Sequence, residues 1–541
     1  MLKTIEKNPI LVLSIVIVLM LLVHLDVPSV TIMEARNFIT AREMVHDHNW
    51  LLTTMNGEAR YQKPPLPTWL SAVSGLLFGI NSIFALRLPA ALMVLVLGVF
   101  LYFLSLKLNL TKLQSFYNAL IVITSFYVFA IINEAPWDIY THGFMLGGIY
   151  FLFLLFEERK TVWRNVMLSA FFIGLSILSK GPVSLFAVFL PFLISYGIVF
   201  KFKEIKTKIF PIIILLILSV LIGGWWFVYV RLADPAAFLE IASKETGNWA
   251  SYNVKPFYYY WSFFTQSGIW AIPALISLLY PYMIKRIENK KVYKFSFWWV
   301  LIAVILLSLI PEKKPRYLMP VLIPLAINIG IYIDFIIQNF KNLSLKKDIF
   351  PVYFNFGLIS FISFSLPIAL LIILKADVKN HLFNFIALTV ACVLIGVNII
   401  KYLRNKNIKV VFYLVILFMI SALSLGLPIS QSLNKNVAYK SINSLHLIED
   451  SSSIKTYSIG EIAPELLWDY NGTLKDIYKN GQLEVPNETR FGLLIMDEDV
   501  PIITSQLNNI YKLELKETYN LNEGSKMKER LIRQFYIISK K

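Results

Sequence analysis

Thirteen apolar runs, separated by short polar or basic segments, occupy most of the first 430 residues of the chain. Most of these runs have roughly the 20 residues that an α-helix needs to cross the hydrocarbon core of a bilayer. They lie at residues 8–25, 85–106, 113–131, 139–156, 165–178, 183–200, 209–229, 263–284, 295–310, 319–339, 350–374, 382–400 and 410–428. The pattern therefore predicts an α-helical polytopic membrane protein with about 13 transmembrane helices.

Lys and Arg are distributed unevenly over the short loops between these runs. With the N-terminus placed inside, the inside loops carry 21 Lys and Arg residues and the short outside loops carry six. Because cytoplasmic loops are enriched in Lys and Arg, this bias predicts a cytoplasmic N-terminus. The odd number of spans then predicts an extracytoplasmic C-terminus, and the first run, which no cleavage site follows, is expected to remain as an anchor.

Two longer loops are predicted on the outside. Residues 66–82 are apolar but short and contain Gly75 and Gly79, and counting them as a span would invert every later loop. We therefore place residues 27–84 in a first outside loop with helices along the membrane surface. Residues 230–262 form a second outside loop, rich in the aromatic residues that are typical of a membrane interface.

Composition agrees with a membrane protein. The chain is 57% hydrophobic and 16% charged, which is too little charge to cover the surface of a soluble protein of this size. The net charge of +17 comes largely from the clusters between apolar runs, so it indicates topology signals and anionic lipid rather than nucleic acid. No glycine-rich phosphate-binding motif is present, and we expect no nucleotide cofactor.

The pattern changes after Ser430. Short β-type runs alternate with Gly, Asn and Pro turns and with helix-like stretches. The sequence thus predicts a transmembrane domain at 1–429, with its outside loops at 27–84 and 230–262, and a small soluble α/β domain at 430–541.

Several cations on the predicted outside face violate the charge bias. Lys63 is followed by Pro64 and Pro65, Lys180 stands between two apolar runs, and Lys313, Lys314 and Arg316 fall within four positions. Charged groups near or within a bilayer are costly and usually mark a site. Because cations bind phosphate well, we predict a phosphate-binding site on this face.

Carboxylates gather on the same predicted face. Glu34 follows the first span, Asp138 precedes the fourth, and Glu134 lies four residues before Asp138. A carboxylate there is suited to act as a general base or to ligate a metal. For Glu134, a simple interfacial charge is an equally good interpretation.

These residues belong to segments that resemble a known family. EARNFITAREM, YQKPPLPTWL, LFGINSIFALRLPAAL, NEAPWDIYTHGFM, SKGP and KKPRYLMPVLIPLAI follow one another in that order. Together they resemble GT-C glycosyltransferases, specifically the aminoarabinose transferase and protein O-mannosyltransferase-like group, over roughly residues 1–340. The chain departs from the family pattern at Met33, Asn37 and Gln62.

The resemblance implies a membrane enzyme of the inner, cytoplasmic membrane that takes a hexose or pentose from a polyprenyl (undecaprenyl) phosphate carrier. It would transfer the sugar to a lipid A-like lipid or another acceptor on the periplasmic or extracytoplasmic face. The implied phosphate ligands are Lys63, Lys180, Lys313, Arg316 and Tyr317.

The resemblance also implies an acidic pole, where Glu34, Arg36 and Asp138, with Glu134 nearby, would bind or activate the acceptor. Glu34 and Asp138 are both candidates for the base and for ligands of a divalent metal. An anionic acceptor such as a lipid phosphate would need no base at all. A carrier or flippase that binds lipid-linked sugars without chemistry would need the same cations, and neutralising the two acids distinguishes it from a transferase.

Overall fold

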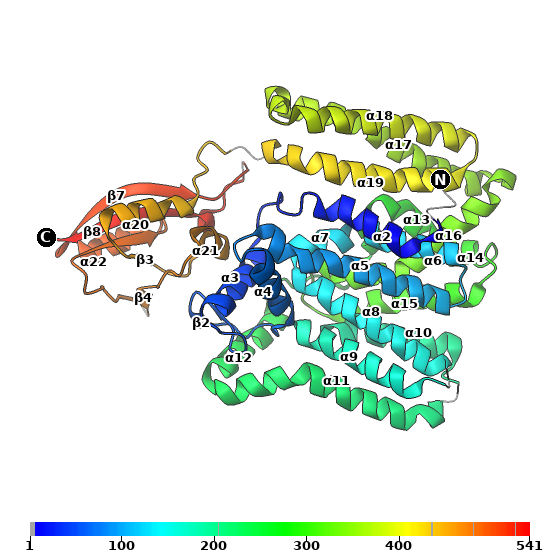
Figure 1. Ribbon diagram of the computed structural model, residues 1–541, viewed down its shortest axis with the longest axis horizontal. Helices are drawn as coiled ribbons and strands as arrows, with labels where there is room; N and C mark the ends of the chain where they lie inside the picture. Colours follow the sequence, from blue (N-terminus) through cyan, green and yellow to red (C-terminus); the bar gives the residue numbers. More distant parts are fainter. Residues whose placement is uncertain (1–5, 159, 204, 434–435, 480, 525) are drawn as a thin grey trace. The chain divides into compact units, whose positions relative to one another are not determined.

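The computed structural model describes residues 6–158, 160–203, 205–433, 436–479, 481–524 and 526–541. These residues form two compact units, drawn in Figure 1 and considered separately below. The first unit comprises Met1–Val27 and Tyr61–Ile429, and the second comprises Pro28–Arg60 and Ser430–Lys541. The sequence grouped all of residues 27–84 with the transmembrane domain, whereas the structure groups Pro28–Arg60 with the C-terminal residues.

The first unit is built almost entirely from helices. Its long helices are α5 (Ile83–Lys107), α6 (Lys112–Thr124), α7 (Phe126–Glu134), α8 (Pro136–Glu157), α9 (Val162–Lys180), α11 (Ile205–Ala233), α12 (Pro235–Ser251), α15 (Lys290–Leu309), α16 (Leu322–Asn339), α17 (Lys346–Leu374), α18 (Leu382–Arg404) and α19 (Ile408–Ser430). Its shorter helical elements are α2 (Pro9–Ile17), η1 (Val18–Leu22), α4 (Leu66–Phe78), η2 (Leu185–Phe189), α10 (Leu190–Phe200), η3 (Phe257–Tyr260), η4 (Phe263–Trp270), α13 (Ala271–Ser277), α14 (Tyr280–Met283), η5 (Pro315–Val321), η6 (Phe340–Asn342) and η7 (Lys375–His381).

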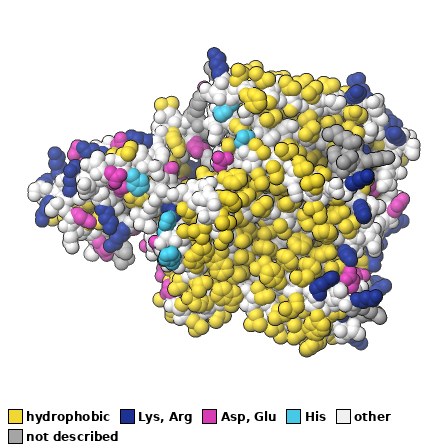
Figure 2. Space-filling view, viewed as in Figure 1, with side chains coloured by type: hydrophobic (Ala, Val, Ile, Leu, Met, Phe, Trp, Pro, Cys, Tyr) yellow, Lys and Arg dark blue, Asp and Glu magenta, His cyan; other side chains and the backbone are white. Residues whose placement is uncertain are grey.

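Ten helical segments among the described residues are long and apolar enough to cross a membrane. They are α5, α6–α7, α8, α9, α11, α15, η5–α16–η6, α17, η7–α18 and α19. Each coincides with a predicted apolar run, and the chain is a multi-pass membrane protein. Figure 2 shows hydrophobic side chains over most of the visible face of this unit, with Lys and Arg gathered at its right-hand edge.

Three of the thirteen predicted runs are not single long helices. Residues 8–25 and 183–200 form shorter helices that contain π-helical turns, η1 and η2. The run at 263–284 is divided into η4, α13 and α14. Gly268 interrupts η4 with a positive φ of 65°, and α14 begins at Tyr280, with Pro281 in its first turn, after a break. The total of 13 spans therefore stays a prediction.

Close helix packing fixes the position of α9. A Cβ atom at Gly223 of α11 would lie 2.5 Å from the Cβ of Ile177 and 2.8 Å from the carbonyl oxygen of Gly174, both on α9. Small residues allow membrane helices to approach this closely. On its other side α9 contacts α8, where the Ser176 hydroxyl donates to the Thr141 carbonyl at 2.6 Å. This packing places the C-terminal end of α9 beside the N-terminal end of α8.

The second unit combines α3 (Ile32–His46) and the hairpin β1 (Thr54–Met55) and β2 (Glu58–Ala59) with the C-terminal residues. The other helices and strands are α20 (Leu445–Ser452), α21 (Pro464–Tyr470), α22 (Val500–Leu507), β3 (Thr456–Ser458), β4 (Tyr478–Lys479), β5 (Gln482–Leu483), β6 (Arg490–Ile495), β7 (Tyr511–Asn520) and β8 (Ile532–Lys540). The main sheet has the order β3-β6-β8-β7, with β3 and β6 parallel and the other pairs antiparallel. The predicted fold class, a helical membrane protein with a small C-terminal α/β region, is confirmed.

Helix α3 is held in this unit by apolar and polar contacts. Phe38 packs edge-on against Trp468 of α21, with 5.3 Å between ring centroids. The buried guanidinium of Arg42 donates to the Asn471 side chain at 2.8 Å and to the carbonyls of Leu467, Trp468 and Gly472, at the C-terminal end of α21. A cation at that end of a helix is favourable, although burial lowers the pKa of Arg42.

Candidate active site

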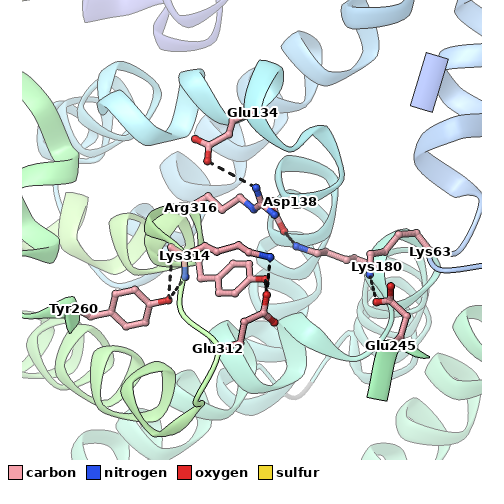
Figure 3. Close-up of polar contacts among 10 residues, drawn as sticks. Lys63, Glu134, Asp138, Lys180, Glu245, Tyr260, Glu312, Lys314 and Arg316 are labelled. Atoms are coloured by element: carbon pink, nitrogen blue, oxygen red, sulfur yellow. Dashed lines mark hydrogen bonds and ion pairs between the residues drawn. The ribbon is translucent and has the colours of Figure 1, made fainter. Parts of the chain in front are cut away.

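Asp138 and Lys180 form an ion pair between the ends of two helices (Figure 3). Asp138 lies in the first turn of α8 after Pro136, and Lys180 is the last residue of α9, which ends at Gly181 with a φ of 73°. The macrodipoles favour an anion at the first position and a cation at the second. The side chain of Asp138 is 3% exposed and that of Lys180 is 14% exposed, so water solvates neither charge well. Each charge is therefore stabilised mainly by the opposite charge of its partner.

The segment after α15 brings more cations to this place. Arg316 is the second residue of η5, directly after Pro315, and its guanidinium lies 3.9 Å from the carboxylate of Glu134. The ammonium of Lys180 lies 5.5 Å from the ring centroid of Tyr317. The structure thus brings together Asp138, Lys180, Arg316 and Tyr317, four residues for which the sequence predicted a role.

Lys314 and Lys313 point to different partners. The ammonium of Lys314 contacts the Glu312 carboxylate at 2.6 Å, and the Tyr317 hydroxyl donates to the same carboxylate at 3.0 Å. The ammonium of Lys313 is buried and donates to the backbone carbonyls of Ile310 and Lys255 at 2.6 and 3.0 Å. Burial lowers the pKa of Lys313. The structure thus turns the Lys313 ammonium toward backbone carbonyls and the Lys314 ammonium toward Glu312 and the Tyr317 ring, and the predicted role of Lys313 as a phosphate ligand stays a prediction.

The second predicted outside loop holds the cationic segment in place. The Tyr260 hydroxyl donates to the Lys314 carbonyl at 3.0 Å and lies 3.1 Å from the Lys314 amide nitrogen. The amides of Lys255 and Lys313 donate to Pro311 and Asn253 across the two segments, at 3.2 and 3.1 Å. Tyr260 is 1% exposed, and this burial raises its pKa. Residues 253–260 and 310–317 therefore form one hydrogen-bonded clasp.

Lys63 approaches from the segment before α4. Its ammonium lies 3.4 Å from the Glu245 carboxylate of α12, and Lys63 and Arg316 are both within electrostatic range of Lys180. Nearby, the Tyr61 hydroxyl donates to Asp234 at 2.9 Å, and burial with this contact raises the pKa of Tyr61 to about 12. This hydrogen bond ties the Lys63 segment to the start of α12.

The predicted residues Glu34 and Arg36 belong to the second unit. Glu34 is fully buried in the first turn of α3, where its carboxylate accepts the Thr31 amide at 3.0 Å and completes a capping box. The carbonyl of Arg36 accepts the guanidinium of Arg60 at 2.9 Å. Their predicted grouping with Asp138 in an acidic pole stays a prediction.

The side chains described here do not match a carboxylate-rich metal site. Within the described ranges, no three His, Cys, Asp or Glu side chains are grouped so that they could hold a metal ion. Asp138 faces an ammonium group, and Glu34 caps a helix. We therefore assign no step to a metal.

Sequence reasoning missed the acids that pair with the cations. Glu245 and Glu312 oppose Lys63 and Lys314, and Tyr260 holds the Lys314 backbone. Glu312 directly precedes the two lysines, so its position next to three cations was a usable signal. Glu245 and Tyr260 are distant in sequence from their partners and offered none.

Sequence comparisons find a protein family and individual proteins that are similar to part of this chain. Residues 62–226 match the dolichyl-phosphate-mannose-protein mannosyltransferase family. An uncharacterized protein of Aquifex aeolicus is 27% identical over 327 residues, which cover 57% of this chain and 60% of the relative. Undecaprenyl phosphate-alpha-4-amino-4-deoxy-L-arabinose arabinosyl transferase 2 of Proteus mirabilis is 23% identical over 323 residues, which cover 58% of this chain and 57% of that protein. The chain thus spans somewhat over half the length of these relatives.

A solved structure is similar over nearly the whole chain. The crystal structure of ArnT from Cupriavidus metallidurans bound to undecaprenyl phosphate superposes with a TM-score of 0.68 at 15% sequence identity, and the match covers 98% of this chain and 97% of that chain. At this identity the likeness shows the fold. Together, the matches confirm the resemblance predicted from the sequence, to glycosyltransferases of the aminoarabinose transferase and protein mannosyltransferase type within the GT-C superfamily.

Proposed function

We propose that this protein is a membrane glycosyltransferase that moves a sugar from a polyprenyl phosphate carrier to a lipid or another acceptor at the extracytoplasmic face. The observation that carries this proposal is the convergence of Lys180, Lys314 and Arg316 with Tyr317 at the ends of apolar helices. A phosphate on a lipid tail needs cations and a hydroxyl donor at the edge of the hydrocarbon layer, which is what these side chains provide. Lys63 adds a fourth cation within electrostatic range of Lys180.

The cations act on the leaving group. In the transfer, the bond between the anomeric carbon and the phosphate oxygen breaks, and its electron pair stays on the carrier phosphate. An oxygen of the acceptor forms a new bond to the opposite face of the same carbon, which inverts its configuration. Negative charge grows on the phosphate as the bond breaks, and pre-positioned cations in a poorly solvated site stabilise that charge in the transition state.

Asp138 is the better supported of the two candidate bases. Its Oδ1 accepts from Lys180, while its buried Oδ2 has no hydrogen-bond partner among the described residues. This oxygen can take the proton of an acceptor hydroxyl as the new bond forms. Glu34 already serves as a helix cap in the other unit. With an acceptor oxygen that is anionic, such as a lipid phosphate, the proton step drops out and Asp138 positions Lys180.

The names of the relatives suggest a class of carrier for this chain, but they do not identify its sugar. The Proteus mirabilis relative is named for undecaprenyl phosphate-linked aminoarabinose, and the Cupriavidus metallidurans structure contains undecaprenyl phosphate. We extend the carrier class, polyprenyl phosphate, to this chain, together with a lipid A-like lipid as the first acceptor to test. The sugar is left open, because the chain departs from the family pattern at Met33, Asn37 and Gln62.

The proposed site requires a defined orientation in the membrane. The Lys and Arg bias supports a cytoplasmic N-terminus and places the cation cluster and the C-terminal unit outside. The outside face is where an extracytoplasmic acceptor would be available.

A transfer assay on the purified full-length protein tests the proposal. Nanodisc-embedded protein is mixed with radiolabelled polyprenyl phosphate sugars and a lipid extract from the host, and label in the lipid product is measured. We expect transfer by the wild type and a loss of at least about 100-fold for Arg316→Ala, because one transition-state contact contributes on that scale. A wild type that binds the donor but transfers nothing to any lipid fraction would instead support a carrier or flippase.

A further inference from the structure

The carboxylate of Glu312 occupies the donors that a phosphate would use. It accepts from the Lys314 ammonium at 2.6 Å and from the Tyr317 hydroxyl at 3.0 Å (Figure 3). Its side chain is only 14% exposed, so this contact is largely shielded from water. Glu312 thus places one negative charge at the cationic segment of the proposed donor site.

The Tyr317 hydroxyl can donate to only one acceptor, either Glu312 or a phosphate. An ammonium has three donors and can serve two acceptors, but a phenol has a single O–H. Tyr317 therefore cannot donate to Glu312 and to a phosphate oxygen at the same time. A phosphate that binds between Lys180 and Tyr317 has to displace the carboxylate from the phenol.

The backbone around Glu312 limits how far the carboxylate can withdraw. Glu312 pairs with Val254 in an isolated antiparallel bridge, and the residues on either side of Glu312 are hydrogen-bonded to Asn253 and Lys255. The Glu312 carboxylate can therefore leave Tyr317 only by rotation of its own side chain, while the backbone stays in place. The negative charge of the Glu312 carboxylate therefore stays near the bound phosphate after its hydrogen bond with the Tyr317 hydroxyl has broken.

We propose that Glu312 is an internal competitor for the carrier phosphate, which holds Lys314 and Tyr317 in the empty site and promotes release of the product. This inference rests on the proposed function. The donor is a phosphodiester with one negative charge, whereas the released carrier is a phosphate monoester with about −1.5 to −2 charges at pH 7. The fixed charge of Glu312 therefore repels the product more strongly than the donor.

The test compares binding of undecaprenyl phosphate to full-length variants in nanodiscs. Glu312→Gln keeps the shape and a carbonyl acceptor for Tyr317 but removes the charge. We expect it to bind undecaprenyl phosphate roughly three- to tenfold more tightly, the scale of a partly buried charge contact. The gain for the sugar-linked donor should be smaller, and turnover should become more sensitive to product inhibition.

Two further variants separate this role from structural effects. Glu312→Asp keeps the charge and should not tighten binding. Glu240→Gln removes one charge from the exposed surface of α12 and should leave binding unchanged. Thermal unfolding confirms that each variant is folded.

The outcomes distinguish the inference from the proposed function. Unchanged or weaker binding by Glu312→Gln would show that Glu312 only orients its neighbours, and an equal gain in Glu240→Gln would show a general field effect. Either result overturns the inference and leaves the transferase proposal standing. A wild type that does not bind undecaprenyl phosphate at all overturns both.

Discussion

Breaking the Asp138–Lys180 ion pair from one side should be costly. Lys180→Met keeps a long apolar stem but leaves the Asp138 carboxylate, 3% exposed, without its counter-ion. Leaving one partner of a buried pair uncompensated costs about 3–5 kcal/mol of unfolding free energy. The double variant Asp138→Asn/Lys180→Met removes both charges, so it should recover about half of that loss or more.

Equilibrium unfolding of the detergent-solubilised protein, followed by tryptophan fluorescence, measures these free energies. Lys107→Met is the matched control, because Lys107 pairs with Glu158 at 2.8 Å with side chains that are 45% and 32% exposed. Exposed pairs contribute about 0–1 kcal/mol, so the control should change little. If Lys180→Met loses no more than the control and the double variant shows additive losses, the account of a buried, mutually dependent pair is wrong.

Two other predictions follow from single contacts, and a third follows from the predicted orientation in the membrane. Tyr260→Phe removes the hydroxyl that bonds the Lys314 backbone and should raise the KM for the donor roughly tenfold, through a loss of about 1–2 kcal/mol, while Tyr259→Phe should not. Arg42→Met should lower the unfolding free energy of the second unit by about 2–4 kcal/mol, because it leaves the α21 carbonyls unpaired; an unchanged melting temperature would contradict this. In a Cys392→Ser background, a cysteine at Ser451 should react with an impermeant maleimide added to intact cells, and labelling only after lysis would refute the orientation.

The sequence predicted the helices well where one apolar run makes one helix. Ten runs coincide with long helices because about 20 apolar residues without strong breakers leave few alternatives in lipid. The run at 263–284 is divided into shorter helices because hydropathy does not register Gly268 at a positive φ or the break before the helix that begins at Tyr280. Nor could hydropathy show that Pro28–Arg60 groups with the C-terminal residues, since this depends on contacts of Phe38 and Arg42 with residues more than 400 positions away.

The candidate site was predicted in part. Lys180, Arg316 and Asp138 stood out because isolated charges between apolar runs are costly, and the structure brings them together. The choice between Lys313 and Lys314 could not be made from the sequence. It depends on the backbone clasp, which turns one ammonium toward carbonyls and the other toward Glu312.

The most direct test of the central claim, a glycosyltransferase with Asp138 at the reacting end of the site, measures transfer and donor binding on the same preparation of Asp138→Asn. Asp138→Asn also breaks the ion pair from one side, so both measurements are made on the folded fraction of the preparation. In that fraction the amide oxygen can still accept from Lys180, and donor binding should stay within about threefold of the wild type. Transfer to a hydroxyl acceptor should fall by about 100-fold or more, because no group takes the proton. Transfer at the wild-type rate to that acceptor would contradict the assignment of Asp138, and a wild type that binds donor without transferring sugar to any acceptor would contradict the claim itself.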